Sequence, residues 1–157
     1  MANYNMNTKT IPARNREAVK QFSVFTPNRM GRLHDLVALF SANSVNVLAI
    51  TILDTTDSSI LRLVFDDPDK ARGLLQDKGF PFTESEVVVV EIESATELHR
   101  LMAALLEAEL NINYLYCFIP HPEGKSMLAM SVEDNEVAEK ILVKHQFRAL
   151  RQSDISR

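Results

Sequence analysis

The chain has 157 residues, of which 46% are hydrophobic and 24% charged, a composition typical of a globular protein. Its net charge of −4 and its dispersed basic residues argue against nucleic acid and anionic membranes as partners. The single cysteine excludes an internal disulfide, and no apolar stretch reaches the roughly 20 residues that span a bilayer. Because the N-terminus has no basic run followed by an apolar segment, we expect a cytoplasmic location.

The sequence contains one long internal repeat. Leu33–Ala38 (LHDLVA) returns 65 positions later as Leu98–Ala103 (LHRLMA), and Asn46 returns as Asn111 at the same shift. A repeat of this length that occurs twice indicates a duplicated small domain rather than a stacked array. A unit of about 65 residues buries only about 60% of its unfolded surface, so we expect the units to complete each other's core or to pair with another chain.

The first copy predicts the order strand, helix, strand, strand, helix, strand. Apolar residues at helical spacing from Leu33 to Phe40 predict the first helix. The second helix is predicted from Asp67 as its N-cap, Pro68 at its first position and Gly79 beyond its C-terminus. The predicted strands, rich in β-branched and aromatic residues, are Lys20–Thr26, Val45–Leu53, Ser59–Phe65 and Pro81–Ser85.

The second copy repeats this order with almost no linker. Its predicted elements are the strand Val87–Glu93, the helix Ala95–Glu109, the strands Asn111–Ile119 and Ser126–Val132, the helix Asn135–Lys144 and the strand Phe147–Gln152. The pattern predicts an α+β fold of two ferredoxin-like βαββαβ units, each an antiparallel sheet with helices on one face. We expect a flexible N-terminal arm over residues 1–17, a first domain over 18–86 and a second over 87–157, with the two sheets fixed side by side.

The predicted strand Asn111–Ile119 is apolar on both alternations, unlike a strand with one face in water. Something must therefore cover its second face. Another subunit is the simplest candidate, although burial against the chain's own other domain would satisfy the pattern equally well.

The sequence resembles proteins made of two ACT domains in tandem, from about Val19 to Ile155. The resemblance rests on the βαββαβ order, on the turn Asn28–Leu33 with its glycine, and on Asn46 at the start of the second strand. In the second copy, Thr96 stands where that glycine is expected. The resemblance implies a regulatory module that binds a free amino acid at an interface between ACT units, with no attached enzyme in this sequence.

The turn before the first helix has groups suited to bind a carboxylate. The need for a tight backbone turn is a second, purely structural explanation for its glycine. Gly31 permits close backbone approach, a helix N-terminus favours anions, and Arg29 and Arg32 add charged donors. Tyr114 and Tyr116 fit either a side-chain pocket or core and dimer packing. The residues predicted to bind the amino acid are Asn28, Arg29, Met30, Gly31, Arg32, Leu33, Asn46, Tyr114 and Tyr116.

The sequence has no recognisable catalytic or nucleotide-binding motif, so we expect no enzymatic activity and no cofactor. His34 and His99 are interpreted as solvated helix residues rather than metal ligands, and Cys117 as a buried, inert thiol. The first hypothesis is a homodimeric sensor of a free amino acid. The alternative is a ligand-free regulatory subunit that docks on an amino-acid biosynthetic enzyme.

Overall fold

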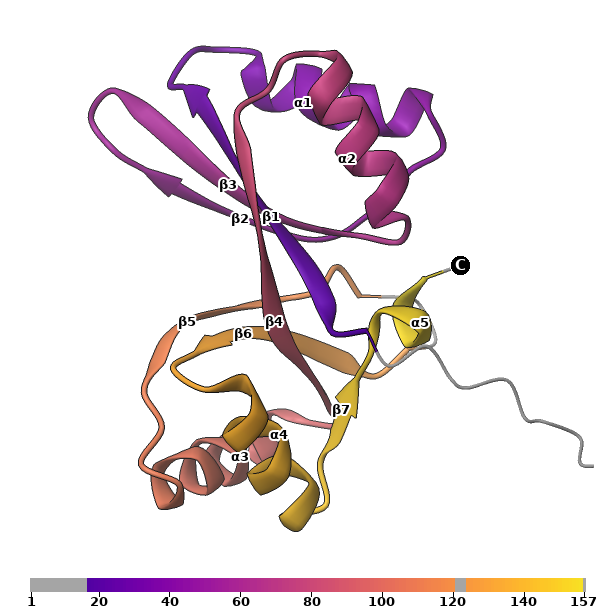
Figure 1. Cartoon of the computed structure of the whole chain (residues 1–157). Coiled ribbons are helices and arrows are strands. Elements are labelled where there is room, and N and C mark those ends of the chain that lie inside the picture. The colour runs from indigo at the N-terminus through magenta and orange to yellow at the C-terminus, as the bar shows by residue number, and fades with distance from the viewer. Residues whose placement is uncertain (1–16, 121–123, 157) are drawn as a thin grey trace, which may run out of the picture.

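The computed structural model describes residues 17–120 and 124–156, so the predicted N-terminal arm lies almost wholly outside the described residues. In Figure 1 the longer helices lie at the two far ends of the molecule, and the strands and the short helix near the C-terminus lie between them. The first unit consists of β1 (Val19–Pro27), α1 (Arg32–Ala42), β2 (Val47–Asp54), β3 (Ser58–Phe65), α2 (Pro68–Asp77) and the beginning of β4 (Phe82–Ile92). Both predicted helices of this copy are present.

The second unit follows the same order and then adds one element. It contains the end of β4, α3 (Ala95–Glu107), β5 (Ile112–Cys117), β6 (Ser126–Val132), α4 (Asn135–Lys144), β7 (Arg148–Leu150) and α5 (Gln152–Ile155). The α+β fold of two βαββαβ units is confirmed, and α5 was not predicted. No helix in the described part of the chain is long and apolar enough to cross a membrane.

One strand, β4, belongs to both units. Its first half pairs antiparallel with β1, from Val24–Phe82 to Val19–Val87, and its second half pairs with β6 and β7. The strands predicted separately as Pro81–Ser85 and Val87–Glu93 are therefore continuous. The result is a seven-stranded antiparallel sheet in the order β2-β3-β1-β4-β6-β5, with β7 also paired to β4.

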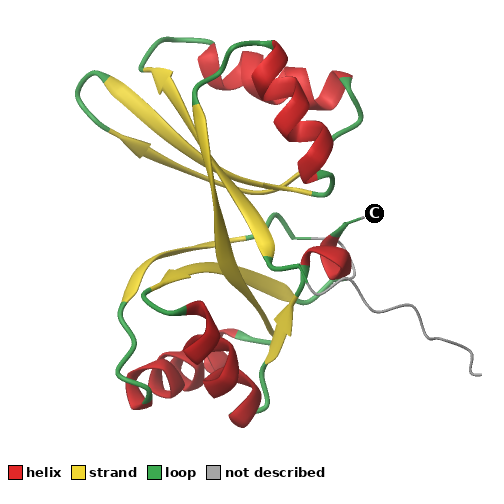
Figure 2. Ribbon diagram, viewed as in Figure 1, coloured by secondary structure: helices red, strands yellow, loops and turns green. Residues whose placement is uncertain are grey.

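The sheet is curled about β4, with α1 to α4 on its outer face (Figure 2). Buried residues form one cluster under α1 and α2, a second under α3 and α4, and a third on the inner face, which we define as the sheet face opposite the helices. The third cluster joins Ala49 and Val64 of the first unit to Tyr116 and Phe118 of the second. The two halves of the sheet thus pack through their inner faces rather than lying simply side by side, because the continuous strand lets the sheet curl over this shared core.

The structure shows what covers one face of β5. Contrary to our expectation, its other face is not covered by the residues that the structure describes. Tyr116 and Phe118 are buried against the first unit, so the chain's own other domain covers this face. The opposite alternation stays open, because β5 is the last strand of the sheet, at its edge. Leu115 and Ile119 are 38% and 54% exposed, and Cys117 is an exposed thiol, not the buried one we expected.

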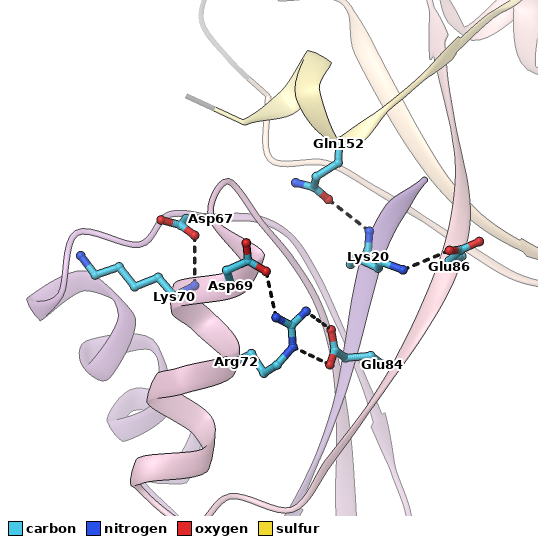
Figure 3. A network of polar contacts seen from close by, with 8 residues as sticks. All are labelled: Lys20, Asp67, Asp69, Lys70, Arg72, Glu84, Glu86 and Gln152. Atoms are coloured by element: carbon cyan, nitrogen blue, oxygen red, sulfur yellow. Dashed lines mark hydrogen bonds and ion pairs between the residues drawn. The ribbon is translucent and has the colours of Figure 1, made fainter. Parts of the chain in front are cut away.

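The short helix α5 attaches the end of the chain to the first unit. The buried Gln152 side chain accepts a hydrogen bond from the Lys20 backbone N–H at 3.1 Å and donates one to the Phe65 carbonyl at 3.1 Å. The first of these contacts is drawn in Figure 3. A four-residue helix has too few positions to show a periodicity, which is why sequence analysis missed this contact.

A charged cluster fixes α2 to β4 in the first unit (Figure 3). Arg72 donates two hydrogen bonds to Glu84, at 2.6 and 2.8 Å, and one to Asp69 at 2.8 Å. The α2 N-terminus is capped as predicted, because the Asp67 carboxylate accepts the Lys70 N–H at 3.0 Å. The hydrogen bonds from Arg72 lower the pKa of Glu84, so folding favours the ionised carboxylate.

Glu84 should therefore stabilise the fold above the pKa of glutamate in the unfolded chain, and this contribution should disappear as the pH falls through the lower folded pKa. Because the pair is partly exposed, we expect Glu84→Gln to cost less than about 1 kcal/mol at pH 7. The variant should also lose less stability than the wild type between neutral pH and pH ~3. Urea denaturation over this range tests the expectation, with the exposed Glu133→Gln as control; identical pH profiles for the wild type and E84Q would contradict it.

Candidate functional site

The turn between β1 and α1 has the backbone geometry that its sequence predicts. Gly31 adopts a φ of +84°, a left-handed conformation that glycine accepts without strain, and it is the N-cap of α1. No side chain among the described residues caps this helix, although the Asp35 N–H donates to the Gly31 carbonyl at 2.9 Å. The start of α1 therefore retains donor capacity and partial positive charge for an anion.

A cleft of about 260 Å³ lies between this turn and the ends of β2 and β3. On the turn side, Asn28, Arg29, Arg32 and Leu33 line it. On the strand side, the lining residues are Ile52, Asp54, Ser59 and Leu61, with Thr26 and Pro27 completing the wall. The Asn28 side-chain amide donates to the Asp54 carboxylate at 2.9 Å, which joins the two sides.

Arg32 is the lining residue with the clearest unmet hydrogen-bonding capacity. Its Nε is buried and has no hydrogen-bond partner among the described residues. The guanidinium carbon lies 6.0 Å from the centre of the Phe80 ring, a position that restrains it without satisfying its donors. A buried donor without a partner is costly, and Arg32 lines the cleft, so a carboxylate bound there would have a guanidinium with unused donors beside it.

The cleft places opposite charges within one small space. Arg29 and Arg32 lie beside the helix N-terminus, and Asp54 lies across from them. A free amino acid has a carboxylate and an ammonium group on one carbon, and this arrangement offers a partner to each. The apolar side chains of Leu33, Ile52 and Leu61 leave an apolar wall for the remainder of such a ligand.

The structure does not bring all the predicted binding residues together. Met30 is fully exposed and is absent from the cleft lining. Asn46 lies at the opposite end of β2 from Asp54, about 25 Å away for a strand of this length, and donates to the Asp66 carboxylate at 2.6 Å.

Tyr114 and Tyr116 lie on the inner face instead. Their hydroxyl groups bond to Gln21, which is separated from Asn28 by most of β1, or about 20 Å. Asp54, Ile52 and Ser59 were not predicted as site residues. The signal available for them was the topology, because a βαββ unit returns its second strand to the sheet that carries the first turn.

The equivalent turn before α3 already holds a carboxylate from its own sequence. Glu97 occupies the position that corresponds to Arg32, and its carboxylate accepts hydrogen bonds from the Glu93 backbone N–H and from Arg100. These two bonds, the backbone one foremost, lower the pKa of Glu97 and keep it negatively charged. A carboxylate ligand at this turn would meet a carboxylate that is already in place.

The two repeated histidines, His34 and His99, are exposed and lie outside the cleft lining. His34 is largely exposed, and its Nδ1 lies 3.4 Å from the Asp35 carboxylate. Within residues 17–120 and 124–156, no three histidine, cysteine, aspartate or glutamate side chains are grouped in a way that would hold a metal ion.

Comparison with known proteins identifies the family. A family model described as an ACT domain pair matches residues 17–157. A solved structure of a Bacteroides thetaiotaomicron protein is 25% identical, with a TM-score of 0.81 over 89% of this chain and 96% of that one. The regulatory subunit of aspartate kinase from Thermus thermophilus, in its ligand-free form, is 12% identical, with a TM-score of 0.57 over 84% of this chain and 94% of that one.

The corresponding subunit from Thermus flavus is 14% identical, with a TM-score of 0.55 over 82% of this chain and 93% of its own. At such identities the two kinase subunits show a shared fold only. No curated protein matches the chain. The family match over nearly the whole sequence, together with the two βαββαβ units joined by β4, places the chain in the family of ACT domain pairs.

Proposed function

We propose that this protein is a regulatory sensor, without catalytic activity, that binds one free amino acid in the cleft between the β1–α1 turn and β2. The carboxylate of the ligand would accept hydrogen bonds from Arg32 and from the start of α1, and its ammonium group would lie near Asp54. The observation that carries this proposal is the cleft that Arg32 and the Asp54 carboxylate line together, in which the buried Arg32 Nε has no partner among the described residues. ACT domains are regulatory modules, which agrees with this role.

The cleft belongs wholly to the first unit, so an interface between ACT units at this site requires a second chain. Apolar side chains beside the cleft remain accessible for such a contact: Leu33 and Val37 on α1 are 37% and 38% exposed, and Ile52 on β2 is 49% exposed. We infer a homodimer in which this surface meets its counterpart and the ligand strengthens the pairing. Ligand would then act by favouring one arrangement over another, which requires different affinities for the two. A cytoplasmic location stays a prediction from the sequence.

A thermal-shift screen against the twenty amino acids tests the proposal. We expect one or a few of them to raise the melting temperature of the wild type, since a ligand that binds only the folded state stabilises it. Arg32→Gln should abolish the shift, whereas Lys78→Gln, which removes an exposed charge of the same unit, should retain it. Binding should saturate at one ligand per chain, because the Glu97 carboxylate already occupies the second turn.

The competing function is a ligand-free subunit whose apolar sheet surface docks on a biosynthetic enzyme or on a second copy of itself. The screen separates the two hypotheses. If no amino acid shifts the melting temperature, the sensor proposal is wrong and the docking function is favoured. A shift that R32Q retains would show that an amino acid binds outside this cleft, and it would overturn the assignment of the site.

A further inference from the structure

The edges of β2 and β5 meet at one end and part at the other. Ala49 and Phe118 form an isolated antiparallel bridge, and the Ile119 N–H donates to the Leu48 carbonyl at 2.8 Å. The same register would next pair Thr51 with Tyr116 and then Leu53 with Tyr114, yet the described residues show neither pair. Figure 1 shows the β2–β3 hairpin leaning away from the second unit at this end. Part of the inner face of the sheet, in the first unit, is therefore left uncovered.

Arg62 of β3 lies at the boundary between the covered and uncovered parts. It pairs with Ser23 and Thr51 across the sheet and is half-buried. Its Nε is buried without a hydrogen-bond partner, and its guanidinium forms no hydrogen bond or ion pair with any residue that the structure describes. A guanidinium carries five donors, so this side chain has an unusual surplus of binding capacity.

The position of Arg62 is held by the second unit. Its guanidinium carbon lies 3.9 Å from the centre of the Tyr114 ring, a close cation–π contact. The Tyr114 hydroxyl in turn accepts a hydrogen bond at 2.7 Å from Gln21, which is fully buried. Because both supports are fixed, the guanidinium would bind an anion with little loss of side-chain entropy.

An apolar row lies next to Arg62 on the same face. Phe25, Ile60 and Leu53 are direct cross-strand partners, one step along the alternation from Ser23, Arg62 and Thr51. Phe25 and Leu53 are 39% and 46% exposed, so this row ends the inner face as an accessible apolar surface. A fixed cation beside an apolar platform selects a ligand with a negative head and an apolar body.

We propose that Arg62, Thr51 and Tyr114, together with the row Phe25, Ile60 and Leu53, bind a small carboxylate that carries an apolar group. The planar carboxylate matches the fork of the guanidinium, and the apolar group covers the row. This site does not depend on the cleft beside α1. The strands β2 and β3 present Ile52, Asp54 and Leu61 to that cleft, and they present the intervening residues to the opposite face.

The test is a titration of the full-length, ¹⁵N-labelled protein followed by NMR, with phenylacetate as the probe. Acetate lacks the apolar group and phenylacetamide lacks the charge, so they serve as matched probes. We expect phenylacetate to shift the Arg62 Nε–H signal and the backbone amides of Thr51, Leu53 and Tyr114. Acetate should bind more weakly, and phenylacetamide should leave these signals in place.

Variants assign the binding to this surface. Arg62→Gln should weaken phenylacetate at least about tenfold, the effect of losing a charge-assisted hydrogen bond, while Arg32→Gln leaves it unchanged. Leu53→Ser retains Arg62, so it should weaken phenylacetate but not acetate, and it decides the question if R62Q fails to fold. Equal binding of phenylacetamide, or shifts confined to residues 28–33 and lost in R32Q, would overturn the proposal; the latter result would assign the carboxylate to the α1 cleft alone.

Discussion

Replacing Phe65 with alanine is expected to lower the free energy of unfolding by about 3–5 kcal/mol, the typical cost of removing a large aromatic side chain from a core. Phe65 is fully buried between α1 and the sheet. Its ring centre lies 4.4 Å from that of Phe40 and 5.3 Å from that of Phe22, so the substitution removes aromatic contacts from two neighbouring elements. The measurement is urea denaturation followed by circular dichroism.

The control for this prediction is Phe25→Ala, which removes the same ring from a position that is 39% exposed. It should cost much less, because less apolar surface returns to water. We also expect F65A to unfold in a single transition with the same midpoint by circular dichroism and by tyrosine fluorescence, since both units share β4 and the inner-face core. Two separated transitions would show that the units unfold independently and would contradict this expectation.

The second large effect is expected at Gln21, where Gln21→Leu should cost about 2–4 kcal/mol. Gln21 is fully buried between the two units. Its Oε1 accepts the Tyr116 hydroxyl at 2.7 Å, and its Nε2 donates to Tyr114 at 2.7 Å and to Ser85 at 3.3 Å. Leucine has a similar volume but leaves the buried Tyr116 hydroxyl without an acceptor.

A triple variant separates the polar effect from a packing effect at this position. Gln21→Leu combined with Tyr114→Phe and Tyr116→Phe removes both tyrosine hydroxyls that Gln21 serves, so it should be markedly more stable than Gln21→Leu alone. The exposed Gln76→Leu is the matched control for the chemistry of the substitution. If the triple variant is no more stable than Q21L, the hydrogen bonds are not the source of the loss. Burial raises the pKa of Tyr116, so the hydroxyl remains a donor throughout a neutral to mildly basic titration.

The local signals in the sequence predicted much of the fold. The cap by Asp67, the proline that follows it and the glycine beyond α2 gave that helix, and α4 begins and ends at the predicted residues. These signals act over a few residues and need no tertiary context. In contrast, Glu84, Ser85 and Glu86 interrupt the apolar pattern, so β4 was predicted as two strands. Their polar side chains face Arg72, Gln21 and Lys20, partners that sequence spacing does not show.

The candidate site was likewise predicted only in part, for the same reason. The turn from Asn28 to Leu33 was predicted because glycine, arginine and a helix start follow one another in the chain. Its opposite wall, with Ile52 and Asp54, comes from a strand whose distance to the turn is set by packing. Arg62 was missed for a related reason. An arginine within a strand usually lies in solvent, and only the curl of the sheet brings Tyr114 over it.

The continuity of β4 also constrains how this gene can change at the junction of its two halves. Phe82 packs under the helices of the first unit, and Val88, Val90 and Ile92 pack under those of the second, while Val87 and Val89 point to the inner face. All these residues that face the helices have even numbers. The two-residue alternation of side chains along β4 therefore runs through the junction without a break. An insertion or deletion of one codon there would turn the second unit's outward residues inward, unless a bulge absorbed it. Length variation between the two halves should therefore be restricted to steps of two residues.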